Sequence, residues 1–261
     1  MIVQDIINIL EQTAPLYLQE SYDNAGLIVG EADMPLSGVL FCLDTTEAIV
    51  DEALAKGCNL IVAHHPVVFR GLKKINGTNW VERTVMKALR AHVAVYAIHT
   101  NLDNVHLQGV NAMIAERLGL SDTRILQPKP GSSDTGAGLL GVLEGPMDET
   151  HFLQHVKNAL RAGCVRYTAP LQRPVRTVAL CGGSGSFLLR DAMAAGADAF
   201  VTADFKYHEF FDADGKILIA DVGHFESEQF TIELLYEIVR EKFHTFALHC
   251  TEVNTNPVYY L

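Results

Sequence analysis

The sequence feature that most constrains the fold is a group of three short β-prone runs. Each run ends in polar residues, and the runs are GVLFCLD (38–44), NLIVAHH (59–65) and VAVYAIHT (93–100). The segments EAIVDEALAKG and WVERTVMKALRA, which lie between them, have apolar residues at helical spacing. Strands that alternate with helices of this length are typical of an α/β fold with parallel strand pairs.

The layout of the first half recurs in the second half, in the runs TVALCGG (177–183), DAFVTADF (198–205) and KILIADVGHFE (216–226). Leu40 and Ile61 in the first two runs are 21 positions apart. Ala179 and Phe200, which hold the matching places, have the same separation of 21 positions. The third interval is longer in the first half, which carries an additional loop after His65. We therefore predict two α/β lobes related by an internal duplication.

The predicted lobes cover residues 1–126 and 127–261. Residues 127–150 include QPKPGSSDTGAG, whose Gly, Pro and Ser content indicates the connection between the lobes, and GAGLLGVLEGP there can hold the first strand of the second lobe. Near the end of the chain, TFALHCTEVNTNP predicts a last strand and a tail that can pack back on the first lobe. Residues 1–15 have helical apolar spacing and no basic n-region, so we expect an amphipathic helix and not a signal peptide.

Composition excludes several classes of function. The net charge of −11 disfavours a nucleic-acid-binding protein, because phosphate contacts need clustered Lys and Arg. The five cysteines are widely spaced and form no C-x-x-C pair, which disfavours a disulfide framework or a cysteine zinc site and favours the reducing cytoplasm. No apolar stretch is long enough for a membrane span, so we expect none.

Candidate functional residues follow the predicted strands, because functional groups in open α/β sheets gather beyond the carboxyl ends of the strands. In the first half, His64 and His65 end the second run, and IHTNLD after the third run contains His99 and Asp103. A histidine pair alone is more often a hydrogen-bonded loop feature, and Asp103 alone could be a turn or cap residue. These residues gain weight only in combination.

In the second half, DVGHFESEQ contains His224 and Glu228, four positions apart at the start of a predicted helix. This spacing places an imidazole and a carboxylate on one helix face. Together the three histidines and two acids form a mixed N/O ligand set, which suits Zn, Mn, Fe, Co or Ni better than Ca or Mg. Five ligands with open positions could serve two divalent ions that share a carboxylate, and such a pair activates water.

Further residues at the strand ends are candidates for acid–base or positioning roles: His99, Asp44, His208 and Asp204. The glycine loop CGGSGS (181–186) lies between a strand and a helical segment. It could bind an anion through backbone N–H groups, but it lacks the lysine of a nucleotide-binding loop, and a tight strand-to-helix turn is the favoured interpretation.

Four motifs in order, AHHPVVFRGLKKI, IHTNLDNVHLQGVN, ALCGGSG and DVGHFESE, resemble the signatures of the Nif3-like family. Members of this family are often named GTP cyclohydrolase I type 2 homologues. The early stretch YDNAGLIVG also resembles a family segment, and the resemblance covers nearly the whole chain. Tyr22 stands where many relatives have Trp, and the stretch between the repeats is too short for the extra domain of some long members.

The resemblance implies two interlocked α/β lobes, a dinuclear metal site in the cleft between them, and ring-shaped homohexamers. It also implies the same ligands by motif, namely His64, His65, Asp103, His224 and Glu228. Because Pro66 breaks the strand after the histidine pair, we predict that the two histidines diverge and that each binds a different ion.

Two functions remain open at this point. The first is a metal-dependent hydrolase acting on a small polar substrate, such as a purine nucleotide like GTP. The second is a non-catalytic metal-binding protein that works in metal delivery, storage or regulation with a partner protein. A third function, association with nucleic acid through a ring pore, is disfavoured by the net charge of −11.

Overall fold

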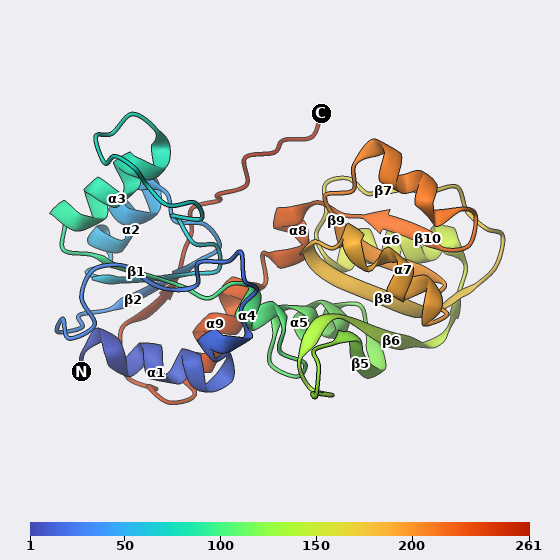
Figure 1. Ribbon diagram of the computed structural model, residues 1–261, viewed down its shortest axis with the longest axis horizontal. Coiled ribbons are helices and arrows are strands. Elements are labelled where there is room, and N and C mark those ends of the chain that lie inside the picture. The colour runs from blue at the N-terminus through green and yellow to red at the C-terminus, as the bar shows by residue number, and fades with distance from the viewer. The chain divides into compact units, whose positions relative to one another are not determined.

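The computed structural model describes residues 1–261 as two compact units. Unit 1 consists of Met1–Leu102 and Thr231–Pro257, and unit 2 consists of Asp103–Phe230 and Val258–Leu261. The chain thus leaves unit 1, builds most of unit 2 and returns to unit 1, as the colour gradient of Figure 1 shows, and Val258–Leu261 belong to unit 2 by their contacts. Each unit is made of two segments that are far apart in the sequence, which is the interlocking that the resemblance implies.

Unit 1 is built around a five-stranded sheet in the order β1-β4-β3-β2-β11. All neighbouring strands are parallel except the edge strand β1, which pairs antiparallel with β4. The strands are β1 (Gly26–Val29), β2 (Val39–Cys42), β3 (Leu60–Ala63), β4 (Ala94–Ala97) and β11 (Leu248–Cys250). Two helices cover each face of the sheet (Figure 1): α2 (Glu47–Ala55) and α3 (Trp80–Arg90) on one, α1 (Val3–Thr13) and α9 (Thr231–Arg240) on the other.

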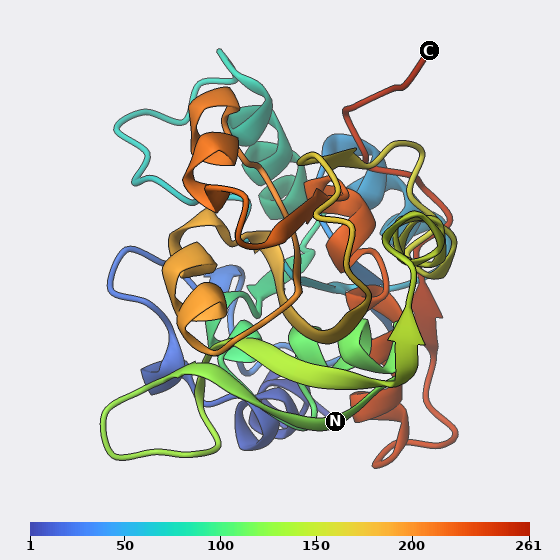
Figure 2. The ribbon, with the colours of Figure 1, turned by 90° about the vertical axis from the view of Figure 1, so that its right-hand side faces the viewer.

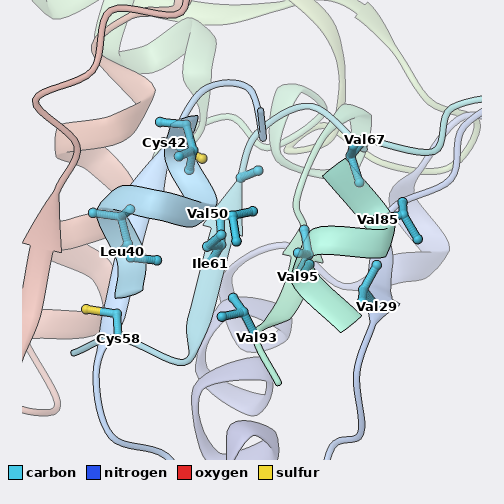
Figure 3. Close-up of a cluster of buried hydrophobic side chains, with 14 residues drawn as sticks. Val29, Leu40, Cys42, Val50, Cys58, Ile61, Val67, Val85, Val93 and Val95 are labelled. Atoms are coloured by element: carbon cyan, nitrogen blue, oxygen red, sulfur yellow. The ribbon is translucent and has the colours of Figure 1, made fainter. Parts of the chain in front are cut away.

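The core of unit 1 follows from strand alternation and helix amphipathicity. Leu40, Ile61 and Val95 are direct register partners on β2, β3 and β4, so their side chains share one face of the sheet. They point toward Val50 of α2 and Val85 of α3, as Figure 3 shows, and none of the five is more than 5% exposed. Burial of each such aliphatic side chain contributes about 1.5–3 kcal/mol, which holds these strands and helices together.

Unit 2 contains a six-stranded sheet in the order β5-β6-β8-β9-β10-β7. Its strands are β5 (Leu120–Pro128), β6 (Gly136–Met147), β7 (Arg166–Tyr167), β8 (Val175–Ser184), β9 (Ala199–Ala203) and β10 (Leu218–Asp221). Figure 2 shows α7 (Leu189–Ala194) on one side of these strands and α6 (Glu149–Ala159) on the other. The remaining elements are α4 (Thr100–Asp103), α5 (Val110–Arg117), α8 (His224–Glu228) and the 3₁₀ turns η1 (Leu16–Leu18), η2 (Ser186–Leu188) and η3 (Tyr207–Ala213).

The predicted duplication is visible in the strand registers. Leu40 pairs with Ile61 in unit 1, and Ala179 pairs with Phe200 in unit 2, so the two equal spacings correspond to equal registers. In both units the third strand of the repeat also pairs with a short antiparallel edge strand, β1 next to β4 and β7 next to β10. The α/β fold class is therefore confirmed. The repeat also includes an antiparallel edge strand, β1 or β7, which the sequence pattern did not indicate.

Residues 127–150 do not form the connection between the units. They contain the end of β5, a loop and all of β6, which pair with each other as an antiparallel hairpin within unit 2. The glycines that suggested a linker allow close strand packing instead, since a Cβ on Gly136 would lie 2.2 Å from the carbonyl oxygen of Gln127. The boundary predicted after residue 126 thus falls inside β5, whereas the chain first leaves unit 1 after Leu102.

Helix α9 and strand β11, which follow unit 2 in the sequence, belong to unit 1. Strand β11 extends the sheet beside β2, where Leu248 pairs with Val39. The last strand therefore packs on the first lobe, which its sequence pattern had allowed. No helix of the structure is both long enough and apolar enough to cross a membrane.

Candidate metal centre

In unit 1, the histidine pair directly follows β3. The backbone N–H of His64 donates to the carbonyl of Cys42 at 3.2 Å, and that of His65 donates to the carbonyl of Leu43 at 2.9 Å. The two residues therefore continue the parallel pairing with β2 before Pro66 ends it. His64 is fully buried and His65 is partly exposed. The sheet itself fixes the backbone position of both histidines.

Both imidazoles are oriented through Nδ1. The Nδ1 of His64 lies 2.8 Å from the carbonyl oxygen of Ile98, and the Nδ1 of His65 lies 2.8 Å from Oδ1 of Asp44. Because a carbonyl can only accept a hydrogen bond, Nδ1 of His64 carries the hydrogen and Nε2 presents a lone pair. A carboxylate on His65 favours the same tautomer. This arrangement is typical of metal-binding histidines.

His99 joins this pair in unit 1. One ring nitrogen from each of His64, His65 and His99 lies within 4.8 Å of the others, so these three side chains form one cluster of possible metal donors. The Nδ1 of His99 is 2.7 Å from Oδ1 of Asp23, whose Oδ2 accepts from the N–H and the hydroxyl of Thr100. Burial acts to raise the pKa of Asp23, but the hydrogen bonds from His99 and Thr100 outweigh it and lower that pKa to about 2. We call these three residues the histidine set.

In unit 2, the short helix α8 carries His224 and Glu228 one turn apart, with Gly223 in front of it at φ +93°. The Nε2 of His224 lies 3.1 Å from Oε2 of Glu228, and its Nδ1 lies 2.7 Å from Oδ2 of Asp204. Burial lowers the pKa of His224, but the carboxylates of Glu228 and Asp204 more than compensate and raise it to about 11. Without an ion, His224 therefore holds a proton that an ion on Nε2 would replace.

The glycine loop allows the end of β8 to pass close to α8. Gly183 has φ +59°, and a Cβ there would lie 2.4 Å from Oε1 of Glu228. Its backbone N–H donates to the hydroxyl of Ser227, and that of Gly182 donates to Oδ1 of Asn111, both at 2.9 Å. These two N–H groups are therefore engaged by the protein, and the glycine at position 183 allows close packing of the loop beside α8.

Asp103 belongs to the same unit and ends α4. Its carbonyl accepts a hydrogen bond from Nδ2 of Asn111 at 2.9 Å, and Asn111 also holds the glycine loop. Burial raises the pKa of the Cys181 thiol, and the nearby carboxylates of Asp103 and Glu228 raise it further. Both carboxylates thus act on one buried thiol in the interior of unit 2. We call Asp103, His224 and Glu228 the carboxylate set.

The residues present fit a divalent transition metal. Imidazole nitrogens and carboxylate oxygens are donors that Zn, Mn, Fe, Co and Ni accept. All four histidines of the two sets have Nδ1 held by an oxygen acceptor, through Ile98, Asp44, Asp23 and Asp204. Glu228 is only 3% exposed, and a buried carboxylate needs a cation or a proton nearby.

The other predicted site residues lie in different surroundings. Asp44 and Asp204 lie directly behind His65 and His224, where they orient the imidazoles. His208 is exposed in η3, where its ring lies against Tyr207 and Phe211, with centroids 5.1 and 6.4 Å away. A role for His208 near either set stays a prediction.

The sequence patterns did not single out Asp23 and Gly183, which lie against the candidate site residues His99 and Glu228. Asp23 lies 76 positions before His99, on the loop ahead of β1, so only the fold brings the two together. The stretch YDNAGLIVG contained it but gave no chemical reason to choose it. Gly183 was visible as a glycine in a loop, but its contact with Glu228 depends on the path of β8.

A family model and a named relative both match nearly the whole chain. The model of the family Duf34/NIF3 (NGG1p interacting factor 3) matches residues 1–257. A Clostridium perfringens protein named GTP cyclohydrolase 1 type 2 homolog is 34% identical over 245 residues, which is 93% of this chain and 92% of that protein.

Two solved structures also match the fold of the whole chain. The chain is similar to the crystal structure of a Bacillus cereus protein related to NIF3, with a TM-score of 0.91 and 25% identity, covering 100% of this chain and 99% of that chain. A Staphylococcus aureus hypothetical protein gives a TM-score of 0.94 at 28% identity, with the same coverage of 100% and 99%.

Proposed function

The chain belongs to the Duf34/NIF3 family, and we propose that it is a metal-dependent hydrolase that binds two divalent transition-metal ions. The ligands in this proposal are His64 and His65 of unit 1 with Asp103, His224 and Glu228 of unit 2. The observation that carries it is the shared support of the imidazoles, since each Nδ1 meets an oxygen acceptor and each Nε2 can face a metal. We assign His64 and His65 to different ions.

When bound, two such ions supply Lewis acidity, which activates water as a nucleophile and stabilises negative charge that develops on oxygen. The protein contributes orientation and proton handling. Asp44 and Asp204 hold the rings of His65 and His224. His99, with Nδ1 held by Asp23, can accept a proton at Nε2 and is our candidate for the general base.

The proposed substrate is a small polar molecule, and a purine nucleotide is the first candidate. It is suggested by the name of the Clostridium perfringens relative, GTP cyclohydrolase 1 type 2 homolog. We further propose a homohexamer, in line with the resemblance. All five cysteines are free thiols, which suits the reducing cytoplasm that we propose as its compartment.

Metal analysis of protein purified without added metal tests the first half of the proposal. We expect about two divalent ions per chain, with a large loss in His64→Ala and Glu228→Gln. His151→Ala is the matched control, because the side chain of His151 is 82% exposed and outside both sets. A metal count near zero in correctly folded wild type would contradict the site.

Assays of the loaded protein test the second half. We expect the loaded protein to hydrolyse GTP or a related nucleotide, and chromatography of the products measures this. The His99→Ala variant should lose this hydrolysis while it still binds metal. Protein that holds two ions but hydrolyses no nucleotide, phosphoester or cyclic amide would favour the alternative, a non-catalytic protein of metal delivery, storage or regulation.

A further inference from the structure

We propose that residues 254–261, here called the tail, carry two positioning residues for the metal centre. Thr255 positions His65 of the histidine set through Asp44, and Tyr260 positions helix α8 of the carboxylate set through Glu226. This inference rests on the proposed function, because it concerns how the same ligands are oriented. Each contact lies within one unit, since residues up to Pro257 belong to unit 1 and Val258–Leu261 belong to unit 2.

The first contact is a relay of two hydrogen bonds in unit 1. The hydroxyl of Thr255 donates to Oδ2 of Asp44 at 2.9 Å, and Oδ1 of the same carboxylate lies 2.8 Å from Nδ1 of His65. With both oxygens engaged, the carboxylate cannot rotate freely about its Cβ–Cγ bond. Thr255 thereby fixes the plane in which Asp44 meets the imidazole, and so the direction of the His65 Nε2 lone pair.

The chain just before Thr255 is firmly attached to helix α2. The carboxylate of Glu52 accepts hydrogen bonds from the N–H of Glu252 at 2.8 Å and from the hydroxyl of Thr251. Val253 packs against the buried cluster between the sheet and helices α2 and α3. The position of the Thr255 hydroxyl is therefore set by the core of unit 1 and is not that of a loose chain end.

The second contact fixes the ligand helix in unit 2. The hydroxyl of Tyr260 hydrogen-bonds to the carboxylate of Glu226, which is 5% exposed and lies midway between His224 and Glu228 on α8. Burial and the neighbouring Glu226 carboxylate raise the pKa of Tyr260, so its hydroxyl remains the donor. A buried carboxyl group needs hydrogen-bond partners, so removal of the Tyr260 hydroxyl would take one of them away and loosen the turn that carries both candidate ligands.

Two glycines make room for Tyr260. A Cβ on Gly163 would lie 2.6 Å from Cδ2 of the tyrosine ring, and a Cβ on Gly223 would lie 2.9 Å from its hydroxyl oxygen. The neighbouring Tyr259 is 90% exposed. Tyr260 itself is 46% exposed, and its close approach to Gly163 and Gly223 distinguishes it from Tyr259, which therefore supplies a control.

For Thr255, the experiment compares Thr255→Val with Thr255→Ser. Competition with a chelator measures Zn²⁺ affinity, and the Co²⁺ absorption spectrum reports ligand geometry. The valine variant should bind about tenfold more weakly, with an altered Co²⁺ spectrum, whereas serine retains the hydroxyl and should match wild type. Loss of one hydrogen bond should lower Tm by only about 2–4 °C. Wild-type affinity and spectrum in Thr255→Val would overturn the role of Thr255.

For Tyr260, the comparison is Tyr260→Phe against Tyr259→Phe. Tyr260→Phe should weaken Zn²⁺ binding about three- to tenfold, and Tyr259→Phe should leave it unchanged. Gly163→Ala provides a second route, because its methyl group displaces the Tyr260 ring while the hydroxyl remains present. Equal affinities for the two phenylalanine variants, together with unchanged affinity in Gly163→Ala, would overturn the role of Tyr260.

A readout without metal separates this inference from the proposed function. Long-range ¹H–¹⁵N NMR spectra of metal-free protein show which nitrogen of His65 carries the hydrogen. Wild type and Thr255→Ser should show Nδ1–H, and Thr255→Val should show a mixture of tautomers. Wild type that binds no metal would contradict the proposed function, and the NMR comparison would still decide whether Thr255 positions His65.

Discussion

The two units share one βαβ arrangement but place their ligand candidates differently. In unit 1, His64 and His65 follow the second strand of the repeat, and the first and third strands lead to their supports Asp44 and Ile98. In unit 2, His224 and Glu228 follow the third strand, β10, and the residue after the second strand is the support Asp204. After the second strand, one copy carries candidate ligands and the other carries a support, so duplication of the scaffold did not duplicate the arrangement of candidate ligands.

The chemistry differs as well. The histidine set offers imidazole nitrogens at the end of a sheet, whereas the carboxylate set adds two carboxylates, Asp103 at the end of α4 and Glu228 on the five-residue helix α8. Carboxylates attract a cation, and imidazoles fixed by a sheet define its geometry. We therefore expect unit 2 to dominate affinity and unit 1 to dominate geometry, and the following predictions test that division.

The largest effect is expected from removing charge in the carboxylate set. Glu228→Gln should weaken divalent-metal binding by more than about a hundredfold, because a direct ligand should matter more than the 10–100-fold of supporting residues. Glu241→Gln makes the same chemical change at an exposed position and should bind as wild type. Titration against a chelator measures both. A loss in His65→Gln that exceeds the loss in Glu228→Gln would reverse the proposed division.

The next effect concerns the close approach of the glycine loop to α8. Gly183→Ala should weaken metal binding about ten- to a hundredfold, because its methyl group would meet Glu228 at 2.4 Å and displace a ligand. Gly196→Ala is the matched control, since Gly196 also has positive φ, +74°, but a Cβ there would meet nothing within 4 Å. Both variants share a backbone cost of about 1–2 kcal/mol. Equal metal affinities in the two variants would show that the contact is unimportant.

The pH dependence of binding should be set by unit 2. Since the pKa of His224 is about 11 in the metal-free protein, the ring is protonated at pH 7, and metal binding must release that proton. Affinity should therefore rise about tenfold per pH unit between pH 6 and 8. Calorimetry in buffers of different ionisation enthalpy counts the released protons. Release of no proton would place His224 outside the coordination shell.

The metal-free protein should show the opposite trend in stability. The folded-state pKa of His224, about 11, is above its ordinary value of 6.5. The stabilisation from its ion pairs is therefore complete below pH 6.5 and is lost as pH rises toward 11. Asp204→Asn removes one partner and should flatten this dependence in urea titrations at several pH values. An unchanged slope would show that the pair does not contribute.

The smallest effect is expected from the support of the histidine set. The pKa of Asp23 is lowered from 3.8 to about 2, so its contribution to stability is present above pH 3.8 and is lost as pH falls through 2. Asp23→Asn should cost about 1–2 kcal/mol at pH 7 and remove this part of the acid sensitivity. Denaturant unfolding at pH 7 and pH 3 measures it. If the free energy of unfolding of Asp23→Asn changes between pH 7 and pH 3 as much as that of wild type does, the acid sensitivity comes from another group.

The sequence predicted the parts of the structure that depend on local patterns. Leu40 and Ile61 lie at the spacing that sets strand register, and His224 and Glu228 lie at the spacing that sets a helix face, so both features appear in the structure as expected. The six β-prone runs all became strands, because each combines an apolar stretch with a polar end.

Contacts between distant segments could not be predicted from patterns. Asp23 meets His99 and Thr255 meets Asp44 only because the sheet and the returning segment bring them together. The boundary near residue 126 was misplaced for a related reason. Gly136 in a tight hairpin has the same composition signal as glycine in a linker, and only the pairing of β5 with β6 separates the two.

The division of unit 1 between two segments has a consequence for synthesis. During translation, residues 1–102 emerge long before α9 and β11, so the nascent sheet lacks an edge strand and one helix cover until unit 2 has been made. Asp44 gains its hydrogen bond from Thr255 later still, because Thr255 follows β11 in the sequence. A chain released before α9 and β11 have been made would carry its histidines on an incomplete sheet, so unit 1 is completed only after most of unit 2 has been synthesised.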